Sequence, residues 1–204
     1  MIRPISCVAV GLALLASVPA LAQRSPLPAP GDQGSRNIKI MSHIPLPGGG
    51  NKGVPNLSGI EIRTADIELE QELSRPYAYV PMWGVPSQIH IISLKDPGKA
   101  KILYTWTVEN VDLHQAAGAL APALVKTHGR YYFVNGFQYG KGGPDYDLGA
   151  IVWDVTGLPD TTSVKEVARI RHPDIPGGFH EVFAYKHSSG AALEIGRASC
   201  RERV

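Results

Sequence analysis

Cysteine is nearly absent from this 204-residue chain, which contains only Cys7 and Cys200. Both lie near the ends, so residues 23–193 contain no thiol. Small exported domains without a large core rely on disulfides, and cysteine-based zinc sites need several thiolates. The middle of the chain therefore has no disulfide framework, no cysteine metal site and no cysteine nucleophile. Its stability must come from a packed core.

An excess of charge of either sign is also absent. Of the 20 Lys and Arg residues, one lies in residues 1–22 and three lie in residues 194–204, which leaves 16 between them. Of the 18 Asp and Glu residues, two lie in residues 194–204, which also leaves 16. A nucleic-acid partner requires a basic face, so this balance argues against one.

No apolar run is long enough to span a bilayer, which requires about 20 residues. The apolar run at residues 8–18 follows Arg3 and precedes Ala20 and Ala22, the small residues at −3 and −1 of a cleavage site. Residues 1–22 are therefore predicted to be a signal peptide that is cleaved after Ala22, which makes the protein secreted or periplasmic. Residues 23–36 form a Pro-rich polar linker. No transmembrane segment is predicted.

The last eleven residues, 194–204 (EIGRASCRERV), interrupt the strand pattern that precedes them. They resemble the translated read-through of a common sequencing adapter. We therefore interpret residues 194–204 as an artefactual tail and expect them to lack fixed packing. The alternative is a genuine basic tail.

Short runs rich in aromatic and β-branched residues occupy the middle of the chain, each bounded by glycine or proline. The runs at residues 123–128, 131–136, 149–155 and 165–171 predict four antiparallel strands joined by polar turns. In the last run, regular alternation places Val167 and Arg169 on one side and Glu166, Ala168 and Ile170 on the other. Four such strands make one β-meander, the unit of a propeller blade.

The same unit occurs earlier, with strands predicted at residues 77–81, 88–94 and 100–108, and a third copy begins at His180. Repeats of roughly 40 to 60 residues with four strands are typical of propellers. The predicted fold class is all-β, an incomplete β-propeller of four-stranded antiparallel meander blades in residues 37–193. The blades are expected at 60–108 and 122–173, with a partial blade at 180–193. The alternative is two unrelated meanders.

Two acidic segments are candidate ligand sites. Residues 66–73 alternate, so that a strand would place four carboxylates on one face and aliphatic side chains on the other. The alternative is a helix, because Leu69 and Leu73 are also an i,i+4 pair. Such a row is either a solvated face or a calcium site. Asp145 and Asp147 have the spacing of two oxygen ligands, and the alternative for them is a plain surface loop.

Residues 151–155 (IVWDV) and the turn at 156–159 (TGLP) resemble the LVIVD repeat of bacterial exported β-propellers. Residues 91–97 are an earlier copy, in which Ser93 replaces the aspartate. The resemblance covers residues 60–193 and implies an exported propeller that binds a protein or small-molecule ligand at one face. We interpret the chain as a non-enzymatic binding scaffold in truncated form. The alternative is a metal-dependent propeller enzyme with channel histidines, similar to selenium-binding proteins.

Two histidines occupy equivalent positions between blades. His114 and His180 each follow the outer strand of one blade and precede the inner strand of the next. A propeller rotation would point both imidazoles towards one channel, where histidines can ligate zinc or copper. The alternative is that each imidazole bonds backbone at a blade junction. No catalytic residue is assigned, because the chain lacks a Gly-x-Ser-x-Gly elbow and a cysteine nucleophile.

Overall fold

The computed structural model describes residues 34–35, 37–44, 46, 63–84, 86–110, 114, 117–139, 145–174 and 177–198. Within these residues the protein is all-β, as predicted, and its helical elements are two short 3-10 turns, η1 (Pro97–Lys99) and η2 (Thr161–Ser163). The predicted signal peptide at 1–22, most of the linker at 23–36 and residues 199–204 of the predicted tail lie outside the described residues.

The strands predicted for the two meanders are confirmed as β5 to β11. The strands of the described chain are β1 (Gly34–Ser35), β2 (Ile38–Lys39), β3 (Arg63–Thr64), β4 (Glu68–Leu69), β5 (Tyr77–Trp83), β6 (Gln88–Ser93), β7 (Lys101–Thr107), β8 (Ala117–Thr127), β9 (Arg130–Tyr139), β10 (Leu148–Asp154), β11 (Lys165–Arg171), β12 (Phe179–Lys186) and β13 (Ala192–Ala198). Strand β8 begins at Ala117 rather than at residue 123, because its ladder with β9 continues past an irregularity between Ala119 and Pro122.

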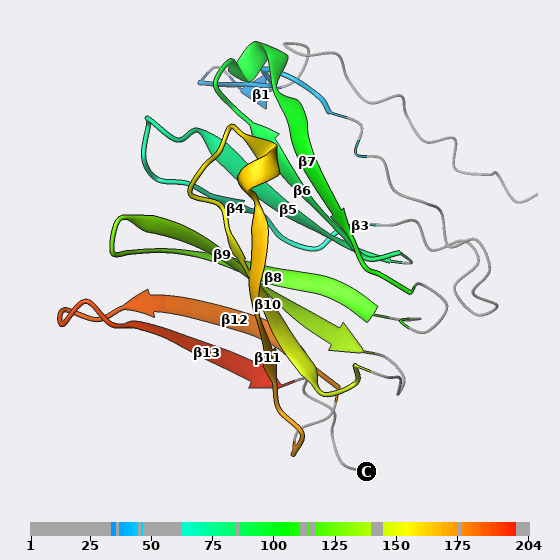
Figure 1. Ribbon diagram of the computed structural model, residues 1–204. Coiled ribbons are helices and arrows are strands. Elements are labelled where there is room, and N and C mark those ends of the chain that lie inside the picture. The colour runs from blue at the N-terminus through cyan, green and yellow to red at the C-terminus, as the bar shows by residue number, and fades with distance from the viewer. Residues whose placement is uncertain are drawn as a thin grey trace, which may run out of the picture.

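The strands form one curled antiparallel sheet in the order β11-β10-β9-β8-β5-β6-β7 (Figure 1). Strands β3 and β4 also pair with β5. The strand ladders of the two halves of this sheet, β5–β7 and β8–β11, join at a single residue pair of the described chain, Trp83 and Gly118. Two further small sheets, β1–β2 and β12–β13, complete the described structure. The halves are therefore nearly separate meanders that curl to face each other.

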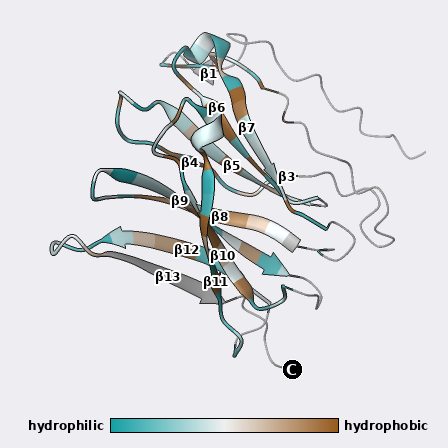
Figure 2. Cartoon of the chain, viewed as in Figure 1, coloured by the Kyte–Doolittle hydropathy of each residue, from teal (hydrophilic) through white to brown (hydrophobic). Residues whose placement is uncertain are grey.

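An aromatic core fills the space between the two halves. The ring of Tyr79 from β5 stacks on Phe133 from β9 with centroids 4.7 Å apart, and Trp106 from β7 meets Trp153 from β10 edge to face at 5.4 Å. Hydrophobic stretches lie along strands such as β7 and β8, and the turn between β8 and β9 is hydrophilic (Figure 2). Burial of such rings is the main stabilising term in a domain without disulfides.

The sheet β12–β13 covers the opposite face of β8–β10. Phe179 and Val182 from β12 pack there against Val134 and Ala150. The Phe179 ring lies so close to Gly149 that a Cβ atom at that position would come within 2.5 Å of the ring. Glycine is required at position 149 because the ring occupies the space that a side chain would need.

The expectation for residues 194–204 needs correction. Strand β13 crosses residue 194, and its backbone pairs with β12 from Ala192 opposite Lys186 to Ala198 opposite Phe179. An exposed strand edge can pair with any extended segment, because the ladder uses only backbone groups. The pairing therefore does not depend on the origin of these residues, and their artefactual origin stays a prediction.

The expectation of a solvated row of four carboxylates at residues 66–73 does not hold for Glu70. Leu73 is 98% exposed and Ile67 is 52% exposed, whereas the side chain of Glu70 is only 1% exposed. The carboxylate of Glu70 is buried because the Arg75 guanidinium donates to it at 2.6 and 3.0 Å, and the Tyr79 hydroxyl also donates to it.

Glu72 is likewise held by neighbouring side chains. Its carboxylate oxygens accept hydrogen bonds from Lys126 Nζ and Tyr131 Oη, each at 2.6 Å. The hydrogen bond from Lys126 and then that from Tyr131 lower the pKa of Glu72. Glu70 and Glu72 thus have basic and phenolic partners from the protein itself.

Arg75 links the first half of the sheet to the second. Besides Glu70, it donates to the carbonyl oxygens of Val155 and Thr156, each at 2.9 Å, and its guanidinium lies 3.9 Å from the centroid of Tyr131. A lysine would keep the charge but lose the planar fork.

We expect Arg75→Lys to lower the free energy of unfolding by about 1–2 kcal/mol, because fewer charged hydrogen bonds and no stacked guanidinium remain. Urea denaturation followed by tryptophan fluorescence measures this change. Arg130→Lys is the matched control, since the Arg130 side chain is 57% exposed and pairs with a single carboxylate, that of the buried Asp154, among the ion pairs found. Equal midpoints for wild type and Arg75→Lys would contradict a linking role for Arg75.

Candidate functional site

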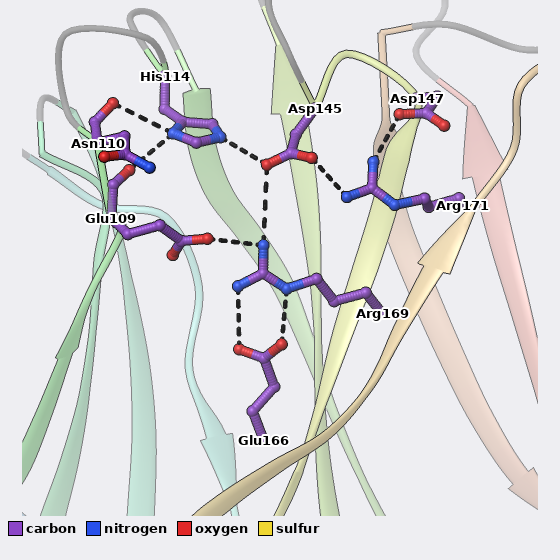
Figure 3. A network of polar contacts seen from close by, with 8 residues as sticks. All are labelled: Glu109, Asn110, His114, Asp145, Asp147, Glu166, Arg169 and Arg171. Atoms are coloured by element: carbon purple, nitrogen blue, oxygen red, sulfur yellow. Dashed lines mark hydrogen bonds and ion pairs between the residues drawn. The ribbon is translucent and has the colours of Figure 1, made fainter.

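A network of charged side chains lies at one end of the curled sheet, where three segments meet. The connection from β7 to β8 contributes Glu109, Asn110 and His114, and the residues that precede β10 contribute Asp145 and Asp147. Strand β11 contributes Glu166, Arg169 and Arg171. Figure 3 shows these eight residues, which we call the clasp.

His114 joins the first half of the sheet to the second. It is 4% exposed, and its Nδ1 donates to the carbonyl oxygens of Glu109 at 2.7 Å and Asn110 at 3.2 Å. Its Nε2 lies 2.7 Å from Oδ2 of Asp145 (Figure 3). Asn110 has a positive φ of 50°, a conformation that asparagine tolerates and that turns the chain back towards the ring. Both ring nitrogens of His114 therefore have protein partners.

Asp145 is the centre of the clasp. One carboxylate oxygen faces His114 and lies 3.7 Å from Arg169, and the other accepts from Arg171. Burial alone would raise the pKa of Asp145, but hydrogen bonds from Arg171 and then His114 outweigh burial and hold the pKa below its usual value. The carboxylate is therefore ionised at neutral pH.

Arg169 holds two further carboxylates. Its Nε and Nη2 donate to Glu166 at 2.6 and 3.2 Å, and its Nη1 pairs with Glu109 at 2.7 Å. The hydrogen bonds to Glu166 and then Glu109 raise the pKa of Arg169. The hydrogen bond from Arg169 is also the largest influence on the pKa of Glu109, which is lowered.

Regular alternation predicted that Glu166 and Arg169 lie on opposite sides of β11, and this prediction is wrong. Trp153 pairs with Glu166 and Val152 with Ala168, so Val167 is an extra residue on β11. This bulge shifts the alternation by one, which brings Glu166 and Arg169 to the same side of the strand. The bulge depends on pairing with β10, so alternation within residues 165–171 could not reveal it.

Tyr139 lies beside the clasp on β9. It is 3% exposed, and its ring centroid is 6.4 Å from that of His114 and also 6.4 Å from that of Tyr146. Burial, followed by the charge of Asp145, raises the pKa of Tyr139, so the phenol stays neutral. The buried ring of Tyr139 therefore lies beside the clasp without adding a charge to it.

The side chains of the clasp bind one another, an arrangement that suits fixing the three segments together better than binding a substrate or a metal. His114 has no ring nitrogen left for a substrate, and the two guanidinium groups beside Asp145 oppose a metal cation. No group of three or more His, Cys, Asp or Glu side chains suited to a metal ion occurs among the residues that the structure describes. Asp145 and Asp147, singled out as possible oxygen ligands, both pair with Arg171 instead.

The structure places His180 differently from His114. The imidazole of His180 is 53% exposed at the irregular start of β12, and its Nδ1 lies 3.9 Å from Glu181. The contacts found for His114 are to Glu109, Asn110, Asp145 and Tyr139, so the described part of the chain does not bring the two histidines into contact. Joint ligation of zinc or copper by His114 and His180 stays a prediction.

Sequence reasoning found His114, Asp145 and Asp147 but missed Glu109, Glu166, Arg169 and Arg171. The available signal was the pair Arg169 and Arg171, two cations two residues apart at the end of one predicted strand. A water-sized gap of ≈ 10 Å³ elsewhere, between Trp106, Phe133 and Trp153, is too small and too apolar to be a ligand site.

Comparison of the chain with protein-family models, with curated proteins and with solved structures finds no match. Among the described residues, no helix has the length and apolar character needed to cross a membrane.

Proposed function

We propose that the chain is an exported, LVIVD-like β-propeller fragment that serves as a scaffold for binding a protein partner at one face. The observation that carries the proposal is the repeated face-to-face packing of meanders. Strands β5–β7, with β3 and β4, pack against β8–β11, and β12–β13 pack in turn on the other face of β8–β10. Propeller blades are likewise meanders that face each other in succession; here the first two meanders are also joined in one curled sheet.

The clasp identifies the binding face within this proposal. It lies at the end where β7 leads to β8, β9 leads to β10 and β11 leads to β12, and it fixes the first two connections to β11. Rigidly positioned loops at one end of a scaffold are where binding residues gather.

The charge of this face favours a protein partner. The side chains of Glu109, Asp147 and Arg171 are 43%, 32% and 38% exposed, so charges of both signs reach solvent there. A rim of mixed sign with an excess of carboxylates suits a protein surface better than nucleic acid, which requires a basic patch.

Site-specific photo-crosslinking in the producing cell tests the proposal. A photoreactive residue at Asp174, exposed just after β11, is expected to give a discrete crosslinked product in the exported fraction. The same residue at Lys95, exposed at the opposite end between β6 and η1, is the control and is expected to give none. The exported chain is expected to begin at Gln23. Crosslinks of equal yield at both positions, or at neither, would rule out binding at the clasp face.

A further inference from the structure

The outer face of β5–β7 is covered by an extended segment of the chain. Val80 and Met82 of β5 face outward, because Tyr79 faces the aromatic core and side chains alternate along a strand. Ile44 and Leu46, which precede β3 in the chain, pack on this outer face. The outer face of β8–β10 is covered by the sheet β12–β13 instead. The two halves of the curled sheet therefore have covers of different kinds.

The covering segment, which we call the strap, comprises residues 40–44 and Leu46. Its burial alternates, since the even-numbered residues from Ile40 to Leu46 are half-buried, whereas Met41 and His43 between them are exposed. This alternation is typical of an extended chain that lays one face on a surface. The strap belongs to none of the strands of the described structure. Side-chain packing therefore holds it in place, without a backbone ladder.

The contact between the strap and the sheet is small. Two aliphatic side chains of the strap, Ile44 and Leu46, pack on the cluster beneath it, and neither is fully buried. An interface that is stable without a tether buries roughly 800 Å² on each side, which two half-buried side chains do not supply. A tether of 16 residues joins Leu46 to Arg63 at the start of β3. Such a tether provides a local concentration on the order of 1 mM, so the strap is expected to leave the face while β5–β7 stay folded.

We propose that the outer face of β5–β7 is a binding surface for an extended protein segment with aliphatic side chains at alternate positions, and that the strap is its internal ligand, which keeps the face closed. The strap identifies the chemistry of the ligand, because Ile44 and Leu46 lie two residues apart and both contact the outward-facing cluster of β5 and β6. A partner segment with the same pattern makes the same contacts, and it must displace the strap to do so.

Fluorescence anisotropy with a labelled peptide of residues 37–46 (NIKIMSHIPL) tests the inference. The peptide is expected to bind wild type weakly, because the strap competes with it. It should bind the double variant Ile44→Asp, Leu46→Asp at least about threefold more tightly. The double variant Ile38→Asp, Met41→Asp is the matched control, since these side chains are 67% and 58% exposed, and it should bind the peptide like wild type. A peptide with aspartate at the positions of Ile44 and Leu46 is expected not to bind.

Methyl NMR of the wild-type chain is a second measurement that requires no substitution. Unlabelled peptide at roughly 1–5 mM competes with a tethered strap of similar local concentration. It is expected to shift the methyl resonances of Ile92 and Ile102, which belong to the covered face, and to leave that of Ile151 in the aromatic core unchanged. This result decides the matter if circular dichroism shows that the strap variant is unfolded.

Equal affinity of the peptide for wild type and for both double variants would overturn the inference, as would methyl shifts no larger at Ile92 than at Ile151. Peptide binding by neither wild type nor the strap variant would also overturn it and would make the strap a permanent part of the core. The clasp is built from other residues, so these results leave the crosslinking at Asp174 unaffected. Failure of the inference can therefore be distinguished from failure of the proposed function.

Discussion

Replacing Gly178 with alanine is expected to lower the free energy of unfolding by about 4 kcal/mol or more and to release β12 from the sheet beneath it. Gly178 has φ +75°, and a Cβ atom would lie 1.9 Å from the carbonyl oxygen of Phe137 and 2.9 Å from that of Leu148. Both obstacles are backbone atoms of β9 and β10, which cannot move aside without breaking their ladders.

Gly190→Ala separates the two causes of this effect. Gly190 has a similar φ of +90°, but a Cβ atom added there would meet nothing within 4 Å. The Gly190→Ala variant should therefore lose only the free energy of unfolding that the left-handed conformation costs an alanine, about 1–2 kcal/mol. Urea denaturation measures both variants, and amide exchange at Val182 and Ala184 reports whether β12 remains docked.

Equal destabilisation by the two alanines would show that close packing of Gly178 on β9 contributes nothing. If Gly178→Ala is too unstable for denaturation curves, rapid exchange confined to β12, with β9 still protected, still supports the expectation. Native exchange rates throughout β12 would contradict it.

Replacing Asp145 with asparagine is expected to lower the free energy of unfolding at pH 7 by about 2–3 kcal/mol. The substitution removes the charge that faces His114, Arg169 and Arg171, while the Asp145 side chain is only 16% exposed. The guanidinium groups keep other carboxylate partners, Glu109 and Glu166 for Arg169 and Asp147 for Arg171, which limits the loss.

The same residue predicts a dependence on pH. The pKa of Asp145 in the folded protein lies below its unfolded value of about 3.9. Its ionised form therefore contributes stability that is fully present above the unfolded pKa and is lost as the pH falls through the lower folded pKa. Denaturation curves between about pH 7 and pH 2.5 should show this loss in wild type, and a smaller one in Asp145→Asn.

Asp147→Asn is the matched control for the clasp. Asp147 lies two residues away, is 32% exposed and pairs only with Arg171 among the ion pairs found, so its effect at pH 7 should be under about 1 kcal/mol. If Asp147→Asn and Asp145→Asn destabilise the protein equally, Asp145 is not the centre of the network.

The order of strands along the chain could be read from local sequence. Residues 131–136 and 149–155 combine aromatic and β-branched side chains between turn-forming residues, and they became β9 and β10. Such preferences act between neighbouring residues, so they do not require knowledge of the rest of the fold. The same reasoning identified His114 and Asp145 as residues of interest but could not pair them, because 31 positions separate them.

The amino-acid sequence by itself determined an all-β chain of successive meanders, a thiol-free and charge-balanced middle, and the positions of the turns. Tertiary structure alone decided which side chains meet. Glu70 became buried because Arg75 and Tyr79 fold against it, and Glu166 joined Arg169 because β10 imposes a bulge on β11. The physical reason is that strand formation follows from short-range preferences, whereas register, bulges and the burial of a charge depend on the partner strand and on the groups it brings.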